Sequence, residues 1–189
     1  MTSQLAYREY KVSLDTTYTF NTGNLDIEAA GEDIILRMPV TIDERIEFPK
    51  ERPFLRSRII FDCVNTKLVN SIGASQWIEW MRRNDRRQQY VFRNCPRKIV
   101  EMMSYMPDFL PQEYTVESFY APYECLECGF EDLELNMRGK DFLEAQNGSE
   151  PTVKVASELN CPKCTGKMEF AVVENVYLRF LNSESKSTK

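Results

Sequence analysis

The sequence of 189 residues contains no histidine, which excludes several classes of enzyme and metal site. Serine and cysteine hydrolases generally need an imidazole to accept the proton of the nucleophile near pH 7. The helix-borne metalloprotease motif and zinc sites with mixed cysteine and histidine ligands need histidine as well. The common hydrolytic machinery is therefore excluded, and no motif points to lysine-based or carboxylate-based catalysis.

Glycine and long apolar runs are also scarce. The 7 glycines are spread along the chain, and no glycine-rich phosphate loop is present. No apolar run approaches the roughly 20 residues of a membrane-spanning helix. The N-terminal residues lack the pattern of a secretory signal, which predicts a cytoplasmic protein with reduced thiols. The formal net charge of −5 argues against general binding to nucleic acid or to anionic membranes.

Alternation of apolar and polar residues predicts strands in the N-terminal third of the chain. Residues 10–20 predict one or two strands. Residues 33–42 predict another, with Pro39 marking an edge or a bulge. One face of that strand would carry Ile34, Leu36, Met38, Val40 and Ile42.

The middle of the chain predicts two buried strands and two helices. Residues 59–64 and 89–92 are mostly apolar, as buried strands are, whereas residues 43–53 are charged and predict a loop or a short helix. Pro96 suits the first turn of a helix that extends to residue 106. Residues 115–123 then predict a further strand.

The helix that follows Ser71 has a clear apolar side. At about 100° per residue, Ala74, Ile78 and Met81 face the core, with Trp77 at the border. Trp80 falls on the flank, where it either packs under a neighbouring loop or the second domain, or contacts a partner.

Four of the six cysteines form two CxxC pairs, which is a strong indication of a metal site. Cys125 and Cys128 form the first pair, and Cys161 and Cys164 form the second. Two such pairs can present four thiolates to one tetrahedral ion, so we expect one structural Zn²⁺, with a redox or iron site as the alternative. The segment is similar to a zinc ribbon. Cys63 and Cys95 lack ligand partners and are expected to be small core residues.

The chain beyond the second CxxC pair predicts an amphipathic helix and a tail. Phe170, Val173, Tyr177, Phe180 and Leu181 recur at helical spacing within residues 168–181. Residues 182–189 contain too few apolar residues to anchor them and predict a flexible tail. Residues 82–98 form the densest basic segment, which is either a solvated surface or a contact for an acidic partner or RNA.

The order of elements across residues 33–122 resembles the STAS domain of anti-sigma factor antagonists and of the cytosolic tails of sulfate transporters. The resemblance is most specific at the turn Asn70-Ser71-Ile72-Gly73, which enters a helix after a buried strand. It implies an α/β fold, a mixed sheet with helices on one side. In the antagonists the matching serine is phosphorylated by a partner kinase and follows an aspartate, where this chain has Asn70.

Three roles for Ser71 are consistent with the sequence. As a nucleophile it would need a histidine, which is missing. As a helix N-cap, Ser71 or Asn70 would accept hydrogen bonds from free backbone amides, which stabilises a helix by about 1 kcal/mol. As a phosphosite or an unmodified docking site, it would control what binds at the start of the helix.

These observations predict a non-enzymatic, cytoplasmic and bacterial regulatory scaffold. We expect a STAS-like domain over residues 1–122, and a zinc ribbon with a C-terminal helix over residues 123–181. The partner would be a kinase or another signalling regulator, bound through Asn70, Ser71, Gly73 and Trp80. The alternative is a nucleic-acid-binding regulator that uses the zinc ribbon and residues 82–98.

Overall fold

The computed structural model describes residues 18–22, 25–48, 58–83, 89–106, 108–145 and 149–182. Several predicted features lie on residues outside these ranges. The predicted strand before Tyr18, residues 49–53 of the charged loop, and the predicted tail beyond residue 182 lie outside the described residues. Within these described ranges, no helix combines the length and apolar character needed to cross a bilayer.

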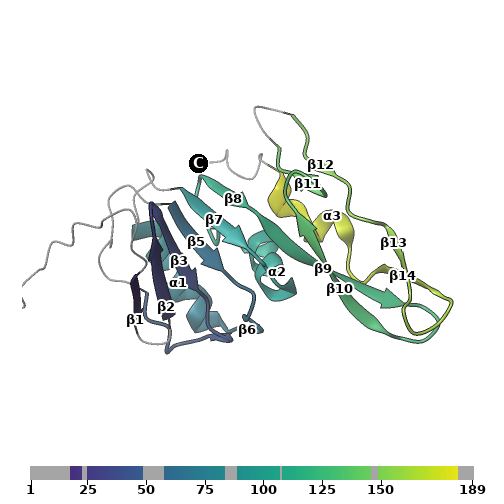
Figure 1. The fold of residues 1–189 in the computed structure, drawn as a ribbon, viewed down its shortest axis with the longest axis horizontal. Coiled ribbons are helices and arrows are strands. Elements are labelled where there is room, and N and C mark those ends of the chain that lie inside the picture. The colour runs from purple at the N-terminus through teal and green to yellow at the C-terminus, as the bar shows by residue number, and fades with distance from the viewer. Residues whose placement is uncertain are drawn as a thin grey trace, which may run out of the picture.

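A six-stranded mixed sheet forms the N-terminal half of the fold (Figure 1). The first three strands pair antiparallel, and the remaining neighbours pair parallel. In spatial order the strands are β1 (Tyr18–Thr22), β2 (Leu25–Ala30), β3 (Asp33–Arg37), β5 (Arg58–Asp62), β7 (Tyr90–Arg93) and β8 (Tyr114–Val116). The predicted α/β class is therefore confirmed.

Two helices connect the parallel strands. Helix α1 (Ser71–Arg83) links β5 to β7, and helix α2 (Arg97–Tyr105) links β7 to β8. Such crossovers are almost always right-handed, so two consecutive ones in the same direction place both helices on one face of the sheet. Among the described residues, no helix covers the other face of this sheet (Figure 1). We call this side the open face of the six-stranded sheet.

The core between α1 and the sheet is centred on Trp77, whose side chain is 0% exposed. Its ring stacks on Phe109 with centroids 4.8 Å apart and lies 4.9 Å from Phe61 of β5. The indole Nε1–H donates to the Phe109 backbone carbonyl at 2.9 Å. Trp77, predicted at the border of the core-facing side, is fully buried, whereas Ile78 is only partly buried. The helix is rotated so that its largest ring fills the space over β5 and β7.

The strand predicted over residues 33–42 is interrupted. Strand β3 ends at Arg37, and β4 (Thr41–Ile42) pairs instead with β6 (Leu68–Val69) in a separate small sheet. Pro39 has no N–H to donate, and its carbonyl accepts a hydrogen bond from the Thr66 hydroxyl at 3.0 Å. The chain turns away here, so Val40, predicted to share a face with Met38 and Ile42, is 53% exposed whereas those two residues are buried.

A second sheet of four antiparallel strands forms the C-terminal half. Its strands, in spatial order, are β10 (Glu131–Met137), β9 (Ser118–Cys125), β14 (Lys167–Phe170) and β13 (Glu158–Asn160). Strand β9 follows β8 after one intervening residue, so the chain passes from one sheet directly into the other (Figure 1). β9 extends across the expected boundary between residues 122 and 123, and independent folding of the two parts stays a prediction. A hairpin, β11 (Phe142–Leu143) with β12 (Thr152–Val153), interrupts the chain between the CxxC pairs.

The helix predicted over residues 168–181 is wrong for its first part. Residues 167–170 alternate in burial and form β14, which pairs with β9. A short helix, α3 (Glu174–Tyr177), and a 3₁₀ turn, η1 (Arg179–Leu181), follow. These elements pack on α2 and β8, because Ser104 Oγ donates to the Tyr177 carbonyl at 2.6 Å and Tyr114 OH donates to the Phe180 carbonyl at 2.6 Å.

Candidate functional site

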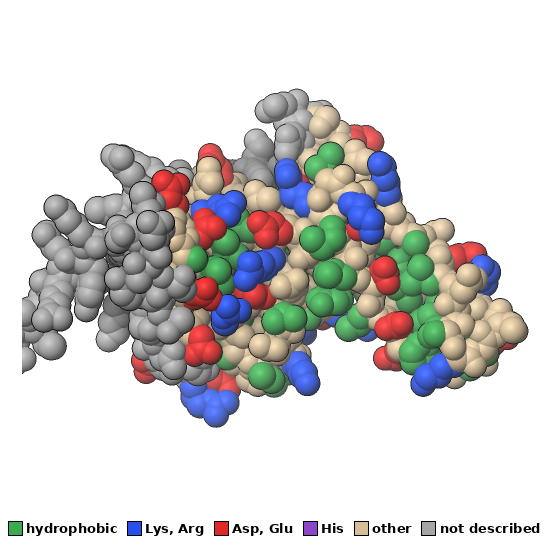
Figure 2. All heavy atoms as spheres, in the orientation of Figure 1, with side chains coloured by type: hydrophobic (Ala, Val, Ile, Leu, Met, Phe, Trp, Pro, Cys, Tyr) green, Lys and Arg blue, Asp and Glu red, His purple; other side chains and the backbone are tan. Residues whose placement is uncertain are grey.

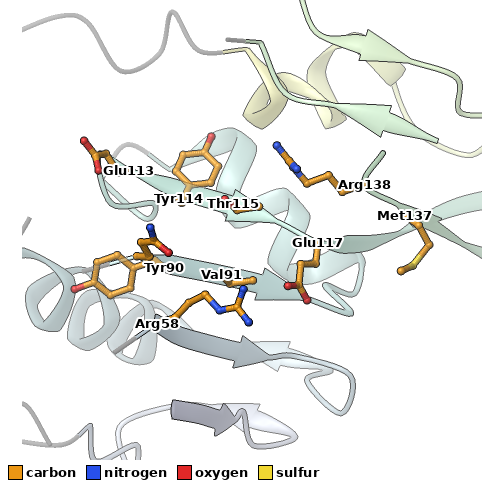
Figure 3. Close-up of a pocket in the computed structure, with 10 residues that line it drawn as sticks. Arg58, Tyr90, Val91, Glu113, Tyr114, Thr115, Glu117, Met137 and Arg138 are labelled. Carbon is orange, nitrogen blue, oxygen red and sulfur yellow. The ribbon is translucent and has the colours of Figure 1, made fainter. Parts of the chain in front are cut away.

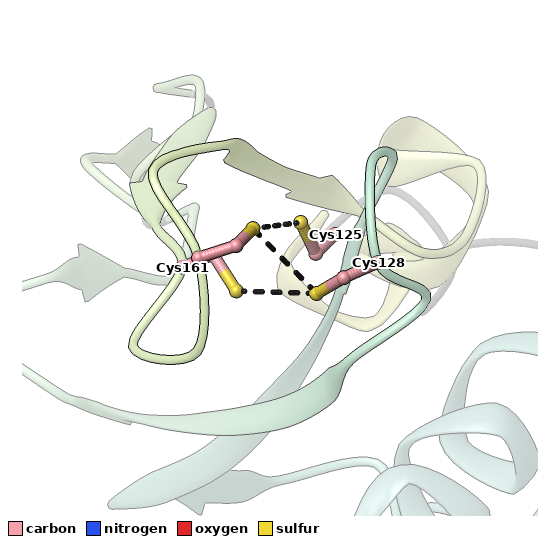
Figure 4. Close-up of side chains that lie close together, drawn as sticks. Cys125, Cys128 and Cys161 are labelled. Carbon is pink, nitrogen blue, oxygen red and sulfur yellow. Dashed lines mark hydrogen bonds between the residues drawn. The ribbon is translucent and has the colours of Figure 1, made fainter.

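The four predicted cysteine ligands come together at the end of the four-stranded sheet (Figure 4). Their sulfur atoms all lie within 4.8 Å of one another. Cys125 Sγ is 3.5 Å from Cys164 Sγ, and Cys128 Sγ is 3.6 Å from Cys161 Sγ. Tetrahedral coordination with metal–sulfur bonds of about 2.3 Å requires sulfur–sulfur distances of about 3.8 Å. The cluster therefore has the size of a four-thiolate metal site.

The two CxxC turns share one kind of backbone hydrogen bond. In the first turn, Cys125 N–H donates to the Phe130 carbonyl at 2.8 Å, five residues on. In the second, Cys161 N–H donates to the Gly166 carbonyl at 3.0 Å, again five residues on. Gly129 has a φ of 67°, which other residues rarely adopt and which lets the first turn close.

Backbone N–H groups point at the sulfur atoms, as they do around metal-bound thiolates. Lys163 N–H donates to Cys161 Sγ at 3.4 Å, and Gly166 N–H donates to Cys164 Sγ at 3.3 Å. Gly166 is tightly placed, because a Cβ there would lie 3.2 Å from Cys125 Sγ. The Lys163 ammonium lies 4.2 Å from the Phe130 ring centroid, so a cation–π contact joins the two turns.

The pKa values of the thiols differ because each sulfur accepts different hydrogen bonds from backbone N–H groups and from the other thiols. The backbone N–H of Cys128 is the largest influence on Cys125 and lowers its pKa to about 7. The N–H of Gly166 lowers the pKa of Cys164, but hydrogen bonds with the other cysteines, led by Cys125, and burial raise it to about 12. Four thiols at these distances cannot all ionise unless a cation lies between them. The donor set therefore suits a divalent metal ion.

The predicted docking turn lies at the start of α1, and Asn70 rather than Ser71 caps the helix. Asn70 Oδ1 accepts a hydrogen bond from Gly73 N–H at 2.8 Å, which is the usual N-cap contact. Asn70 Nδ2 also donates to Glu44 Oε2 at 3.0 Å. Ser71 is exposed, and its backbone carbonyl accepts from the Ser75 hydroxyl at 2.8 Å. The capping role that the sequence left open between two residues belongs to Asn70.

Gly73 is buried and allows α1 to approach the backbone of β4. A Cβ at this position would lie 2.3 Å from the Ile42 carbonyl oxygen and 2.8 Å from the Asp43 amide nitrogen. Neither backbone atom can move away as a flexible side chain could. Gly73 therefore serves close packing beneath the turn.

Trp80 lies on the flank of α1, as predicted, and is partly buried. Its ring stacks on Phe48 with centroids 5.1 Å apart and meets Phe61 edge to face at 6.0 Å. Phe48 ends the described part of the segment predicted as loop or short helix, and residues 43–48 are irregular. This contact corresponds to packing under a neighbouring loop, the first of the two alternatives for Trp80.

The segments that lead into the turn, and the turn itself, carry exposed aliphatic side chains, which the sequence did not predict. Val40, Leu68 and Ile72 are each 53% exposed. Leu68 N–H donates to the Val40 carbonyl at 3.2 Å, so the β3–β4 and β6 segments are joined here. Ile72 follows Ser71 directly. We call Val40, Leu68, Ser71 and Ile72 the turn patch. In the sequence, the only indication of this surface was that Val40, Leu68 and Ile72 each stand next to polar residues.

The charged residues of the basic segment are paired within the described part of the chain. Residues 84–88 of this segment lie outside the described residues. The ion pairs of the others are Arg82–Asp108, Arg83–Glu79, Arg93–Asp62, Arg97–Glu101 and Lys98–Glu101. Burial raises the pKa of Asp62, but hydrogen bonds from Asn94 and Arg93 lower it below its ordinary value. The described arginines of this segment therefore form ion pairs within the protein itself.

Cys63 and Cys95 are fully buried, as predicted, and lie away from the four-cysteine cluster, at the ends of β5 and β7. Burial, followed by the contact with Cys63, raises the pKa of Cys95. Both are therefore core residues, and the Cys95 thiol is neutral at ordinary pH.

Comparison with known proteins provides no relative. No family model matches the sequence, and neither the curated proteins nor the solved structures contain a match.

Proposed function

We propose that the chain is a non-enzymatic, STAS-like regulatory scaffold that binds a protein partner through the turn patch and carries one structural zinc ion. The observation that carries the proposal is the exposed Ser71 hydroxyl beside three aliphatic side chains that are each 53% exposed. Aliphatic groups beside one modifiable hydroxyl form the kind of mixed surface that protein partners use. The partner is a kinase or another signalling regulator.

The arrangement of strands supports the STAS-like assignment. An antiparallel hairpin, β2 and β3, leads into the parallel strands β5, β7 and β8, with the connecting helices on one face. Ser71 begins the first of these helices, where the resemblance places the regulated serine. A phosphate there would face the backbone N–H groups of the first helical turn, which favour negative charge.

The four-cysteine cluster supports zinc in a structural role. A site of four thiolates has no open coordination position for water, and zinc is the ion most often held this way. Purified protein kept reduced should contain about one zinc ion per chain by metal analysis. Cys128→Ser should abolish that stoichiometry and speed hydrogen exchange in β13 and β14 while β3, β5 and β7 remain protected. Iron in place of zinc would correct the metal, and absence of any stoichiometric metal would refute the site.

Charge favours a protein partner over nucleic acid. The described arginines of residues 82–98 are paired with acidic side chains, as given above, and few are left to contact phosphates. We expect no binding of duplex DNA or RNA at 150 mM salt in a mobility-shift assay. Binding that weakens steeply with salt would instead support the nucleic-acid alternative.

Affinity capture with variant proteins tests the docking face. The native partner is captured with wild-type protein, and its affinity is then measured for Ser71→Asp and Ile72→Asp. Both variants should remain folded and should weaken binding, Ile72→Asp by about 2 kcal/mol if the side chain is a hot spot. Val173→Asp, at a side chain that is 67% exposed on the C-terminal half, is the matched control and should bind normally. Wild-type affinity in both turn variants would show that the partner binds elsewhere.

A further inference from the structure

The four-stranded sheet carries one glutamate from each strand in a single row. Glu131 of β10 lies opposite Glu124 of β9, and Glu124 lies opposite Glu169 of β14. Glu169 in turn lies opposite Glu158 of β13. Directly opposed residues point to the same face of a sheet, and all four side chains are exposed. We call these residues the glutamate row.

The charge of the glutamate row is not balanced by the described part of the protein. None of its four carboxylates makes an ion pair or a hydrogen bond with a described residue. Lys167, two residues before Glu169 on the same face, donates instead to Asn160 at 2.6 Å. Like charges directly opposite one another destabilise a sheet. The row therefore carries a cost in stability that no described contact offsets.

The open face of the six-stranded sheet behaves differently. There, opposite charges are matched across neighbouring strands, as the ion pairs Arg37–Glu28, Arg58–Asp33 and Arg93–Asp62. One sheet of the molecule thus pairs its own charges, including that of the buried Asp62, and the other presents four exposed glutamates that are unpaired among the described residues.

An exposed apolar stripe runs beside the glutamate row. Leu133, Leu135 and Met137 follow Glu131 along β10 at a period of two, so they share its face. Leu133 is 49% and Met137 42% exposed. We call these three residues the β10 stripe. Figure 2 shows hydrophobic side chains, with acidic ones beside them, over the region that Figure 1 labels β9 and β10.

The β10 stripe ends at a hollow where the two sheets meet. Met137 lines this hollow of about 580 Å³ together with Arg58, Val91 and Thr115 of the six-stranded sheet and with Glu117, which lies between β8 and β9 (Figure 3). The hollow adjoins the end of the stripe, and charged side chains, among them Arg58, Glu117 and Arg138, line it beside Met137 and Val91. Acidic row, stripe and hollow therefore form one continuous surface.

The edge of β10 is less suited to pairing with another strand. Leu133 N–H is bound by Asp132 Oδ1 at 2.8 Å, and Met137 N–H is bound by Asp141 Oδ2 at 2.9 Å. Carboxylates thus occupy backbone donors that an added strand would need. A partner is expected on the face of the sheet and not along its edge.

We propose that this face binds a basic, partly apolar segment of a partner protein, whose lysines or arginines contact the glutamate row while its apolar side chains cover the β10 stripe. Nucleic acid and anionic lipid carry the charge of the row and are repelled by it. The proposal rests on the protein-binding function proposed above, but it concerns a surface separate from the turn patch.

Selection from an unbiased peptide library tests the proposal. Random peptides displayed on phage are selected against the metal-loaded, full-length protein, and enriched sequences are synthesised for measurement of Kd by fluorescence anisotropy. Enriched peptides should combine lysine or arginine with apolar residues. The double variant Glu124→Lys, Glu169→Lys should weaken their binding at least tenfold, and Leu133→Ser about fivefold, with circular dichroism unchanged.

Matched controls separate this surface from the turn patch. The double variant Glu32→Lys, Glu150→Lys changes the net charge equally at two exposed positions outside the row and should bind the peptides normally. Ile72→Asp should also leave peptide affinity unchanged. The turn patch is tested separately, by the affinity of the captured native partner. The proposal is overturned if no peptide is enriched, if enriched peptides lack basic residues, or if the two double variants weaken binding equally.

Discussion

Replacing Asn70 should cost stability that replacing its neighbour Ser71 does not. Asn70 Oδ1 caps α1 through the N–H of Gly73 at 2.8 Å, and loss of such a cap typically costs about 1 kcal/mol. Its exposed hydrogen bond to Glu44 adds a few tenths at most. We therefore expect Asn70→Ala to lower the free energy of unfolding by about 1 to 1.5 kcal/mol. Ser71→Ala should change it by less than about 0.5 kcal/mol, as surface substitutions usually do.

Urea unfolding of the metal-loaded protein, followed by tryptophan fluorescence, measures both changes. The two tryptophans lie on α1, so the signal reports on the helix that the cap stabilises. Asn70→Asp keeps the acceptor and serves as the conservative control, with stability close to that of the wild type. The reasoning is refuted if Ser71→Ala is as destabilising as Asn70→Ala, or if Asn70→Ala is neutral.

Three further substitutions are expected to have distinct effects on stability. Gly73→Ala should lower the free energy of unfolding by about 2 to 3 kcal/mol in urea, because its Cβ meets the Ile42 carbonyl, and a loss below 1 kcal/mol would contradict this contact. Asp62→Asn should cost about 2 kcal/mol near pH 7, because it leaves Arg93 without its carboxylate. Since the folded-state pKa of Asp62 is lowered, its contribution is present above about pH 4 and lost as the pH falls further, so the variant should have a shallower acid transition. Glu124→Gln should raise the free energy of unfolding by about 0.5 kcal/mol at low salt, and the gain should shrink in 0.5 M NaCl if repulsion is its cause.

The sequence predicted the parts of the fold that depend on local pattern. The CxxC spacing identified all four cysteines, because a CxxC turn presents both its thiolates to one ion and the ligands need not be adjacent in sequence. The helix from Ser71 followed from apolar periodicity, and the α/β class followed from the resemblance of the element order to the STAS domain. Burial of Cys63 and Cys95 followed from their apolar neighbours.

Features that depend on tertiary contacts could not be predicted. The break after Arg37 arises because Thr66, distant in sequence, binds the Pro39 carbonyl. Residues 167–170 fit a helical and a strand pattern equally well over such a short run, and pairing with β9 decides between them. Whether Asn70 or Ser71 is the cap depends on the residue at which the helix begins, and apolar periodicity does not define a helix start to within one residue. The glutamate row is invisible without strand register, since its members lie far apart in the sequence.

The order in which the chain is synthesised matters for α2. This helix is made from residues 97–105, but its outer side is covered by α3 and η1, at the end of the described chain. On the ribosome, where synthesis proceeds from the N-terminus, the apolar side chains of α2 and β9 would stay exposed until residues 174–181 emerge. A nascent chain of this protein is therefore expected to expose apolar surface over that interval. Stop codons shortly before residue 174 would make that exposure permanent, and such products are expected to aggregate or to be degraded.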